Sequence, residues 1–189
     1  MIINFTNLSL FPVFLPLLLG EGWGEVGARG LIINSMKKEY SFEELLHKAA
    51  SYCSISEHCI SEVEEKLKAW CVSCDQKQKI IDKLISEDFI NEKRFCNYFV
   101  KDKFRFNKWG KIKISYALKQ KGLDHDMIAQ SLNTIDEGEY EEMLGAILKT
   151  KLKTMKWEYE YEKMGKLFNF AQGRGFESAV IDRVIRTLG

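Results

Sequence analysis

The sequence predicts an all-α protein, built as a tandem array of three three-helix repeats that is elongated and free to curve. The chain of 189 residues contains only two prolines, Pro12 and Pro16, and glycine is sparse from Met36 onward. Helices tolerate such a stretch, whereas turn-rich β-proteins rarely do. Apolar residues also recur at three- and four-residue spacing, the period of a helix with one buried face. A helix–turn–helix pattern that occurs more than once completes the prediction.

The first repeat is expected over residues 39–90. Ser41 and Glu44 have the spacing of a capping box, which marks the start of a helix. A second helix is expected to begin at Ser56. Apolar residues at helical spacing mark the buried faces of the three helices: Leu45, Leu46 and Ala49, then Ile60, Val63 and Leu67, then Ile80, Ile81, Leu84 and Ile85.

The second repeat is expected over residues 91–135. Asn91 begins its first helix, and Gly110 separates this helix from the next. Gly122 has the place of a C′ glycine, where a left-handed backbone ends a helix, and Asp124 is expected to cap the last helix. The predicted apolar faces are Phe95 with Tyr98 or Phe99, then Ile112, Tyr116 and Leu118, then Ile128 and Leu132.

The third repeat is expected over residues 136–189, with helices at 140–155, 157–172 and 176–188. Its second half has the same apolar pattern as the second repeat, at a constant offset. The first repeat shows this pattern more loosely, through Val63, Leu67, Ile80 and Leu84. The matched pairs are Ile114 and Leu167, Leu118 and Ala171, Gly122 and Gly175, Leu123 and Phe176, Ile128 and Ile181, and Leu132 and Ile185.

Residues 1–35 are expected to be a non-native or disordered extension, with the native start at Met36. No basic residue precedes their apolar run, as a secretory signal would require, so a start-site artefact is favoured over a targeting signal. The run is also broken by proline and too short to span a bilayer. No membrane partner is therefore expected.

The five cysteines favour a cytoplasmic protein without a metal or other cofactor. They are odd in number and irregularly spaced, so a disulfide framework is not expected and a reducing compartment fits better. Cys71 and Cys74 form a single CxxC pair, whereas a zinc site would need a second pair. The three histidines lie in separate segments without a nucleophile motif, so the protein is predicted not to be an enzyme.

Positive charge is concentrated in residues 91–122. This segment contains ten lysines and arginines but only two acidic residues, although the net charge of the whole chain is only +1. Phe104, Phe106 and Trp109 lie among these cations, and a positive strip with stacking partners suits a polyanion. The candidate partner- and DNA-binding residues are Arg94, Lys101, Lys103, Arg105, Lys108, Trp109, Lys111, Lys113, Lys119 and Lys121.

Some of these side chains have an equally good structural explanation. Arg94 is as well placed to pair with Asp88 as to touch a ligand, and Phe95 and Phe99 suit a core better than a binding surface. The first repeat is acidic, so duplex DNA is not expected to cover the whole molecule. Reversal of Lys101, Arg105 and Lys108 to glutamate is predicted to abolish function, and reversal of Lys149 and Lys153 to leave it largely intact.

Residues 88–123 resemble the signature of the RecX family of bacterial recombination regulators: DFINEKRFCNYFVKDKFRFNKWGKIKISYALKQKGL. The threefold helical repeat extends the resemblance over about residues 40–188. Lys111 and Lys113 stand where the family often has arginine, which keeps the charge but disfavours bidentate contacts. The matching positions are Phe89, Asn91, Arg94, Phe95, Phe99, Val100, Arg105, Gly110, Ile112, Leu118, Lys121, Gly122 and Leu123.

The resemblance implies a regulatory protein that binds filaments of the RecA recombinase on DNA. It would inhibit their ATP hydrolysis and strand exchange in recombination and SOS DNA repair. A monomer is expected, because the sequence has neither a long heptad pattern nor an isolated apolar stripe. The alternative is a stand-alone helical module that binds DNA or RNA directly.

Overall fold

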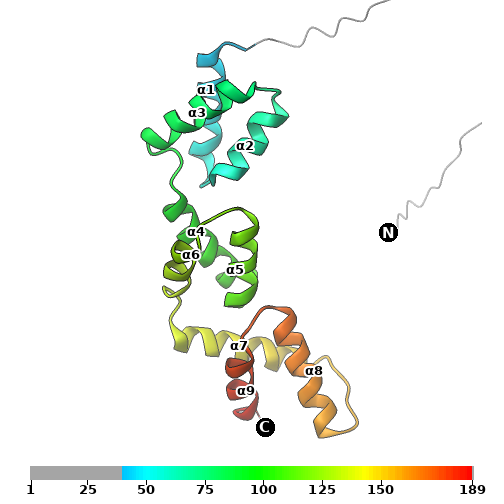
Figure 1. Cartoon of the computed structure of the whole chain (residues 1–189). Helices are drawn as coiled ribbons and strands as arrows, with labels where there is room; N and C mark the ends of the chain where they lie inside the picture. The colour runs from blue at the N-terminus through cyan, green and yellow to red at the C-terminus, as the bar shows by residue number, and fades with distance from the viewer. Residues whose placement is uncertain (1–39, 189) are drawn as a thin grey trace, which may run out of the picture. The chain divides into compact units, whose positions relative to one another are not determined.

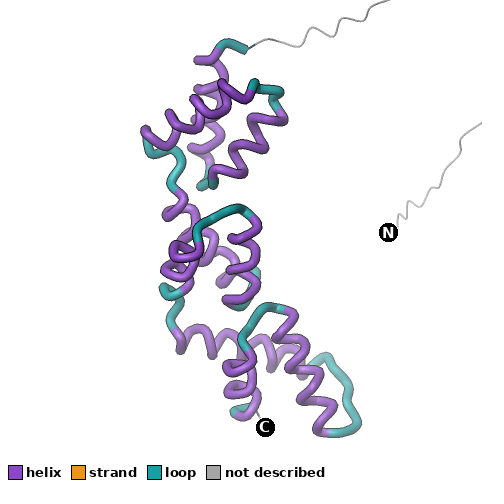
Figure 2. Tube along the Cα trace, viewed as in Figure 1, coloured by secondary structure: helices purple, strands orange, loops and turns teal. Residues whose placement is uncertain are grey.

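The computed structural model describes residues 40–188, in which all regular structure is helical (Figures 1 and 2). The all-α prediction is thus confirmed, while the extension over 1–35 and the start at Met36 lie outside the described residues. The helices of this part are α1 (Phe42–Ile55), α2 (Ile60–Ala69), α3 (Cys74–Ser86), α4 (Glu92–Arg105), α5 (Lys111–Gln120), α6 (His125–Leu132), α7 (Glu137–Leu152), α8 (Glu160–Gly173) and α9 (Ser178–Arg186).

The helices pack in threes, as the tandem three-helix prediction requires. The principal helix–helix contacts fall into three groups. In the first group α1 and α2 both contact α3. In the second α4, α5 and α6 contact one another, and in the third α7, α8 and α9 do so. In Figure 1 these groups follow one another along the chain. We call them repeat 1 (α1–α3), repeat 2 (α4–α6) and repeat 3 (α7–α9).

The same turn ends the second helix of every repeat. In repeat 2 the N–H of Gly122 donates to the carbonyl of Lys119 and that of Leu123 to Leu118 (3.0 and 3.3 Å). Gly122 and Gly175 adopt positive φ angles of 81° and 86° at this turn, and Cys71 takes the corresponding place in repeat 1 at 60°. This turn confirms the predicted C′ glycine and gives the repeat its backbone basis.

Local capping explains most of the helix starts. Ser41 and Glu44 form both bonds of the capping box, and Asn91 and Asp124 each accept a backbone N–H from the first turn that they cap. The predicted start at Ser56 is wrong. Its backbone is extended and its hydroxyl lies 2.9 Å from Nε2 of His58, so α2 begins only at Ile60.

Two predicted buried faces need correction. In α5 the inward residues are Ile114 and Leu118, whereas Ile112 and Tyr116 are 55% and 65% exposed. In α3 the exposed Ile85 lies outside the core. The helices of repeat 3 also begin or end a few residues from the predicted positions. The helix α7 begins early because Asp136 caps it before the apolar pattern starts.

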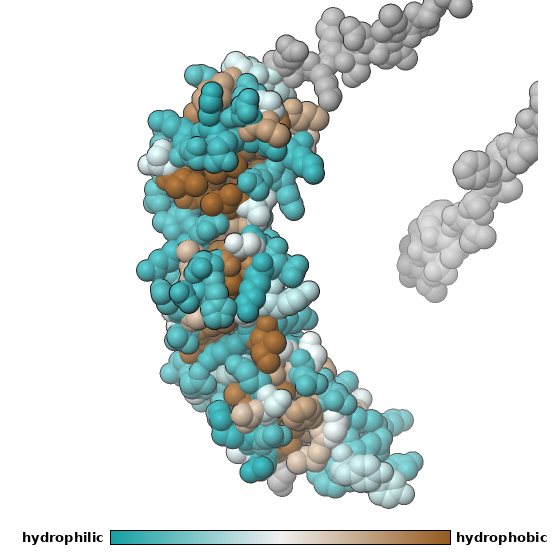
Figure 3. All heavy atoms as spheres, in the orientation of Figure 1, coloured by the Kyte–Doolittle hydropathy of each residue, from teal (hydrophilic) through white to brown (hydrophobic). Residues whose placement is uncertain are grey.

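The buried side chains form two cores. One lies within repeat 1, around Leu67, Ile80 and Leu84, which are fully buried. The other runs through repeats 2 and 3 and includes Leu118 and Tyr140. No helix in residues 40–188 is long and apolar enough to cross a membrane. Figure 3 shows a mostly hydrophilic face, on which hydrophobic residues form separate patches.

Candidate nucleic-acid interface

The predicted binding residues lie on α4, on α5 and in the connection between them, residues 106–110, except for Lys121, which is the C-cap residue of α5. The N–H of Trp109 donates to the carbonyl of Lys103 (3.1 Å), which folds the connection back over the last turn of α4. Lys108 reaches this geometry through a positive φ of 57°. The connection therefore holds Trp109 beside the cations of both helices.

Lysines and rings alternate along one row on these elements. The ammonium of Lys113 lies 4.7 Å from the Trp109 ring centroid, and that of Lys103 lies 5.9 Å from the same ring. Lys103 is also 5.1 Å from the Phe99 ring, which Lys121 approaches at 5.9 Å. We call Lys113, Trp109, Lys103, Phe99 and Lys121 the cation–ring row. Each contact is of the cation–π type.

Four predicted cations make no ion pair with any residue in the described part of the chain: Lys101, Lys108, Lys113 and Lys119. All but Lys113 are exposed. Arg105 is 61% exposed and lies 3.7 Å from Glu139, a loose pair. Apart from Lys113, which lies over the Trp109 ring, these side chains can meet an external anion without breaking a close internal contact.

Three other predicted cations are held in ion pairs with other segments of the protein. Arg94 donates from Nε to Glu57 (2.6 Å) and from a terminal nitrogen to Asp88 (2.9 Å), so the structural alternative for Arg94 holds. The ammonium of Lys111, which is only 16% exposed, pairs with Glu137. These two side chains connect segments of the fold and are poorly placed to meet a partner.

Lys121 is the third of these cations. Its ammonium lies 2.5 Å from Glu62 of α2. Burial by itself would raise the pKa of Glu62, but hydrogen bonds from Lys121 and His58 outweigh it and hold this pKa below its ordinary value of 4.5. Burial likewise opposes the charge of Lys121, yet the hydrogen bond to Glu62 raises the pKa of Lys121 above its ordinary value of 10.5. The pair is therefore ionised at neutral pH.

The aromatic residues of repeat 2 also fall into two groups, those buried in the core and those exposed at the surface. Phe95 and Phe104 are 3% and 2% exposed and belong to the core. This burial is the one expected for Phe95, and it removes Phe104 from the candidate stacking partners. Phe106 is 80% exposed beside Lys108. Tyr116, which the sequence predicts to be buried, is exposed on the same face of α5 as Lys119. The repeat pattern could have revealed Tyr116, because it places Ile114 and Leu118 inward.

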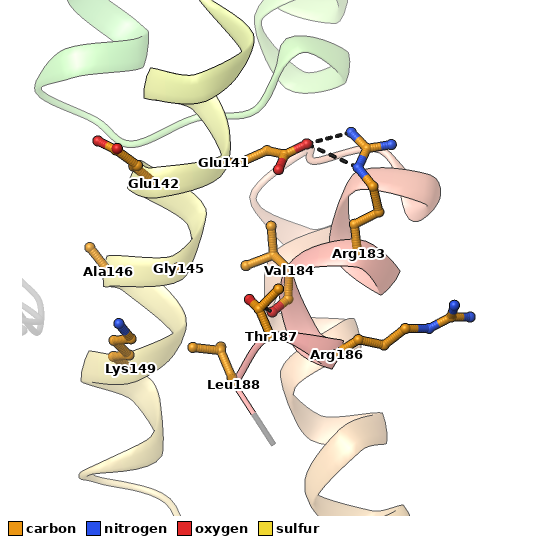
Figure 4. Close-up of a pocket in the computed structure, with 10 residues that line it drawn as sticks. All are labelled: Glu141, Glu142, Gly145, Ala146, Lys149, Arg183, Val184, Arg186, Thr187 and Leu188. Carbon is orange, nitrogen blue, oxygen red and sulfur yellow. Dashed lines mark hydrogen bonds and ion pairs between the residues drawn. The ribbon is translucent and has the colours of Figure 1, made fainter.

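A hollow lies between α7 and α9 (Figure 4). It has a volume of about 630 Å³, and small or apolar residues such as Gly145, Ala146 and Val184 line it. Arg183 is occupied by two hydrogen bonds to Glu141 (2.9 and 2.6 Å), and the Thr187 hydroxyl donates to a backbone carbonyl. The lining thus offers no paired nucleophile and base. No group of potential ligands in residues 40–188 could hold a metal ion.

Sequence comparison identifies a matching family model and several relatives of this chain. The family model described as RecX, second three-helix domain, matches residues 91–132. The regulatory protein RecX of Prosthecochloris aestuarii is 29% identical over 143 residues, which are 76% of this chain and 92% of the relative. RecX of Clostridium botulinum is 31% identical over 127 residues, 66% and 59% of the two chains. RecX of Lactobacillus gasseri is 32% identical over 108 residues, 57% and 40%. The chain thus spans less than two thirds of the last two relatives.

Solved structures share the fold. The crystal structure of RecX from Lactobacillus salivarius superposes with a TM-score of 0.71 and 24% identity, over 78% of this chain and 96% of that one. A second crystal structure, of regulatory protein RecX, gives a TM-score of 0.68 and 19% identity, over 77% and 73%. The arrangement of helices is therefore that of these proteins.

Proposed function

The chain belongs to the RecX family of regulatory proteins, and from this premise we propose that it binds RecA recombinase filaments on DNA. It restrains ATP hydrolysis and strand exchange by the filament. In this role the protein works as a cytoplasmic monomer, without a catalytic centre or a cofactor.

The observation that carries the proposal is the set of unpaired cations on repeat 2. Lys101, Lys108 and Lys119 are exposed and lack an ion pair with any described residue, and the cation–ring row lies on the same helices. A filament presents phosphates along its length, and lysines that neutralise phosphates release counterions. Binding through this surface should therefore weaken steeply as salt rises.

The decisive experiment measures RecA ATP hydrolysis on single-stranded DNA. Combined reversal of Lys101, Arg105 and Lys108 to glutamate should abolish inhibition, because it places three anions where phosphates are expected. The matched control reverses Lys68 and Lys79, exposed lysines of α2 and α3 that make no ion pair with a described residue. This control should inhibit nearly as well as the unmodified chain. Equal loss in both variants would contradict a contact specific to repeat 2.

The stoichiometry of inhibition separates the proposal from direct nucleic-acid binding. A modulator of the filament slows ATP turnover when it is far less abundant than the recombinase. A protein that only sequesters DNA acts in proportion to the DNA that it covers, and added free DNA reverses its effect. Inhibition that appears only near saturation of the DNA would favour the stand-alone nucleic-acid-binding module.

A further inference from the structure

We propose that the connection between α7 and α8 is a second binding surface, which takes single-stranded DNA by stacking its bases on exposed rings. The surface comprises Trp157, Tyr159 and Tyr161 together with Lys156, and we call it the α7–α8 ring surface. It belongs to repeat 3, outside the basic segment of repeat 2. Its binding to DNA does not require the recombinase.

Exposed rings are concentrated in this connection. Trp157, Tyr159 and Tyr161 are 40%, 59% and 77% exposed, and they make up half of the exposed aromatic side chains in residues 40–188. None of the three is among the residues that pack on the core of repeats 2 and 3, although the neighbouring Met155 is. The fold therefore does not account for these rings, and exposed apolar surface of this kind commonly marks a binding site.

The rings are arranged as platforms. Tyr159 and Tyr161 stack on each other, with ring centroids 5.7 Å apart and an angle of 13° between the planes. The ammonium of Lys163 lies 5.8 Å from the centroid of Trp157. Successive bases stack on such exposed aromatic faces in proteins that bind single strands with little sequence preference.

Lysine supplies the charge that a strand requires. Lys151, Lys153 and Lys156 precede the rings, and none of them makes an ion pair with a described residue. Lys153 and Lys156 are exposed. The segment from Lys149 to Trp157 contains four lysines and no acid. Phosphates next to stacked bases would meet this positive segment.

The nearby acids are largely neutralised. Glu160 pairs with Lys163 at 2.9 Å, and Glu162 pairs with Lys166 at 2.6 Å. Glu158 is the acid of this segment without an ion pair to a described residue. The cations that precede the rings consequently dominate the local charge, which favours an anionic ligand.

Lys156 stands between two adjoining surface hollows. One, of about 690 Å³, is lined by the three rings, by Lys156 and Lys166, and by the acids Glu158 and Glu162. The other, of about 510 Å³, shares these two lysines and adds Phe170. Lys166 donates to the carbonyl of Lys156 (2.8 Å), which fixes the backbone at their common edge. A strand can thus lie across a cationic edge with aromatic surface on either side.

The sequence repeats this combination at corresponding places. Lys108–Trp109 lies between the first and second helices of repeat 2, and Lys156–Trp157 lies between those of repeat 3. Trp109 is partly buried and flanked by the lysines of the cation–ring row. Trp157 is more open and has two exposed tyrosines beside it. The repeat 3 connection is therefore better suited to stacking with unpaired bases.

The test is fluorescence anisotropy of a labelled oligothymidylate with the full chain and no recombinase. Combined Trp157→Ala and Tyr161→Ala substitution should weaken binding at least about ten-fold, the loss expected when base stacking is removed. Combined Trp157→Phe and Tyr161→Phe substitution keeps both rings and should retain most of the affinity. Ile55→Ala, which trims an 85% exposed apolar side chain in repeat 1, should have no effect.

The proposal would be overturned by no binding of the unmodified chain, by unchanged binding of the alanine variant, or by equal loss in the phenylalanine and alanine variants. Circular dichroism of each variant checks that the helices are intact. Loss of recombinase binding with unchanged oligothymidylate binding would identify the rings as a protein contact and would also overturn it. Inhibition of RecA is measured separately, so failure here leaves the proposed function standing, and the reverse also holds.

Discussion

Repeat 2 meets its two neighbours in different ways. Toward repeat 3 the contact is continuous with the hydrophobic core, and backbone groups join directly. The N–H of Gly110 donates to the carbonyl of Arg174 (2.9 Å), and that of Ile112 donates to the carbonyl of Gly175 (3.0 Å). We call this contact, together with the Tyr140 hydroxyl described below, the 2–3 joint.

Toward repeat 1 the contact is mainly polar. Arg94 binds Glu57, Lys121 pairs with Glu62, and the hydroxyl of Ser61 donates to the carbonyl of Lys121 (2.7 Å). We call these contacts the 1–2 joint. Repeat 1 has a core of its own, and Cys59 is its one residue assigned to the core of repeats 2 and 3. Repeat 1 can therefore open separately, as locally stable units do.

This difference shows that charge in repeat 2 serves two purposes. Arg94 and Lys121 hold repeat 1, and Lys111 pairs with Glu137 of repeat 3. The exposed Lys101, Lys108 and Lys119 remain available for the proposed partner. The number of cations in the sequence is thus larger than the number that the proposed interface can use.

The largest expected effect comes from filling the 2–3 joint. A Cβ atom at Gly110 would overlap the carbonyl of Gly175 and the amide nitrogen of Phe176, both backbone groups. Gly110→Ala should lower the free energy of unfolding by about 3 kcal/mol, the upper part of the range for overpacking. Urea denaturation followed by circular dichroism measures this loss.

Gly165→Ala is the matched control. Gly165 lies within α8, and nothing lies near the position of an added Cβ. Because alanine favours helix over glycine, this variant should gain about 0.5–1 kcal/mol. Equal stability of the two alanine variants would contradict a close backbone contact between repeats 2 and 3.

Features set by neighbouring residues can be predicted from the sequence. Helix caps such as Ser41, Asn91 and Asp124 depend on side chains that bond to their own first turn. The turn of repeat 1 is harder to recognise, because Cys71 adopts there the positive φ that glycine usually supplies. The sequence therefore predicts three repeats but leaves the first one loosely matched.

Long-range pairing cannot be predicted in this way. Arg94 binds Glu57 and Lys121 binds Glu62 across 37 and 59 residues, and no local pattern identifies such partners. Lys121 is accordingly predicted as part of the interface, although it holds repeat 1. The rings at 157–161 escape prediction for a related reason, since helical spacing alone does not reveal which aromatic side chains stay exposed.

The next effect in size comes from the Tyr140 hydroxyl. It donates to Glu177 (2.6 Å) and accepts the backbone N–H of Lys111 (2.9 Å). Tyr140→Phe should cost about 2 kcal/mol, because it leaves both partners partly buried without this bond. The hydroxyl links the backbone of Lys111 in repeat 2 to Glu177, the N-cap residue of α9 in repeat 3. Because phenylalanine keeps the ring and removes only this hydroxyl, the substitution weakens the 2–3 joint without changing its packing.

The pH dependence of stability provides an independent test of Tyr140. Burial, followed by the hydrogen bond to Glu177, raises the pKa of Tyr140 above its ordinary value of 10.0. The unfolded chain therefore releases this proton first, and the folded state loses stability as pH rises above 10. The difference between the unmodified chain and Tyr140→Phe should shrink there. A constant difference between about pH 8 and 11 would contradict a buried, neutral hydroxyl.

The smallest effect is expected at the 1–2 joint. Glu62→Gln keeps the shape of the side chain but removes its charge, which should cost about 1 kcal/mol because the pair with Lys121 is partly exposed. Hydrogen exchange measured by mass spectrometry should quicken in α1–α3 and stay unchanged in α4–α9. Glu64→Gln, at an exposed neighbouring position, should leave both regions unchanged.

Acid distinguishes the charge of Glu62 from its packing. The pKa of Glu62 is lower in the folded state than its ordinary value of 4.5, so its contribution is complete above 4.5 and is lost as pH falls through the folded value. The Glu62→Gln variant should therefore be less stable than the unmodified chain at neutral pH and should approach it only in acid. Faster exchange throughout α1–α9 at neutral pH would instead mean that the two joints open together, because a separately opening repeat 1 confines the change to its own amides.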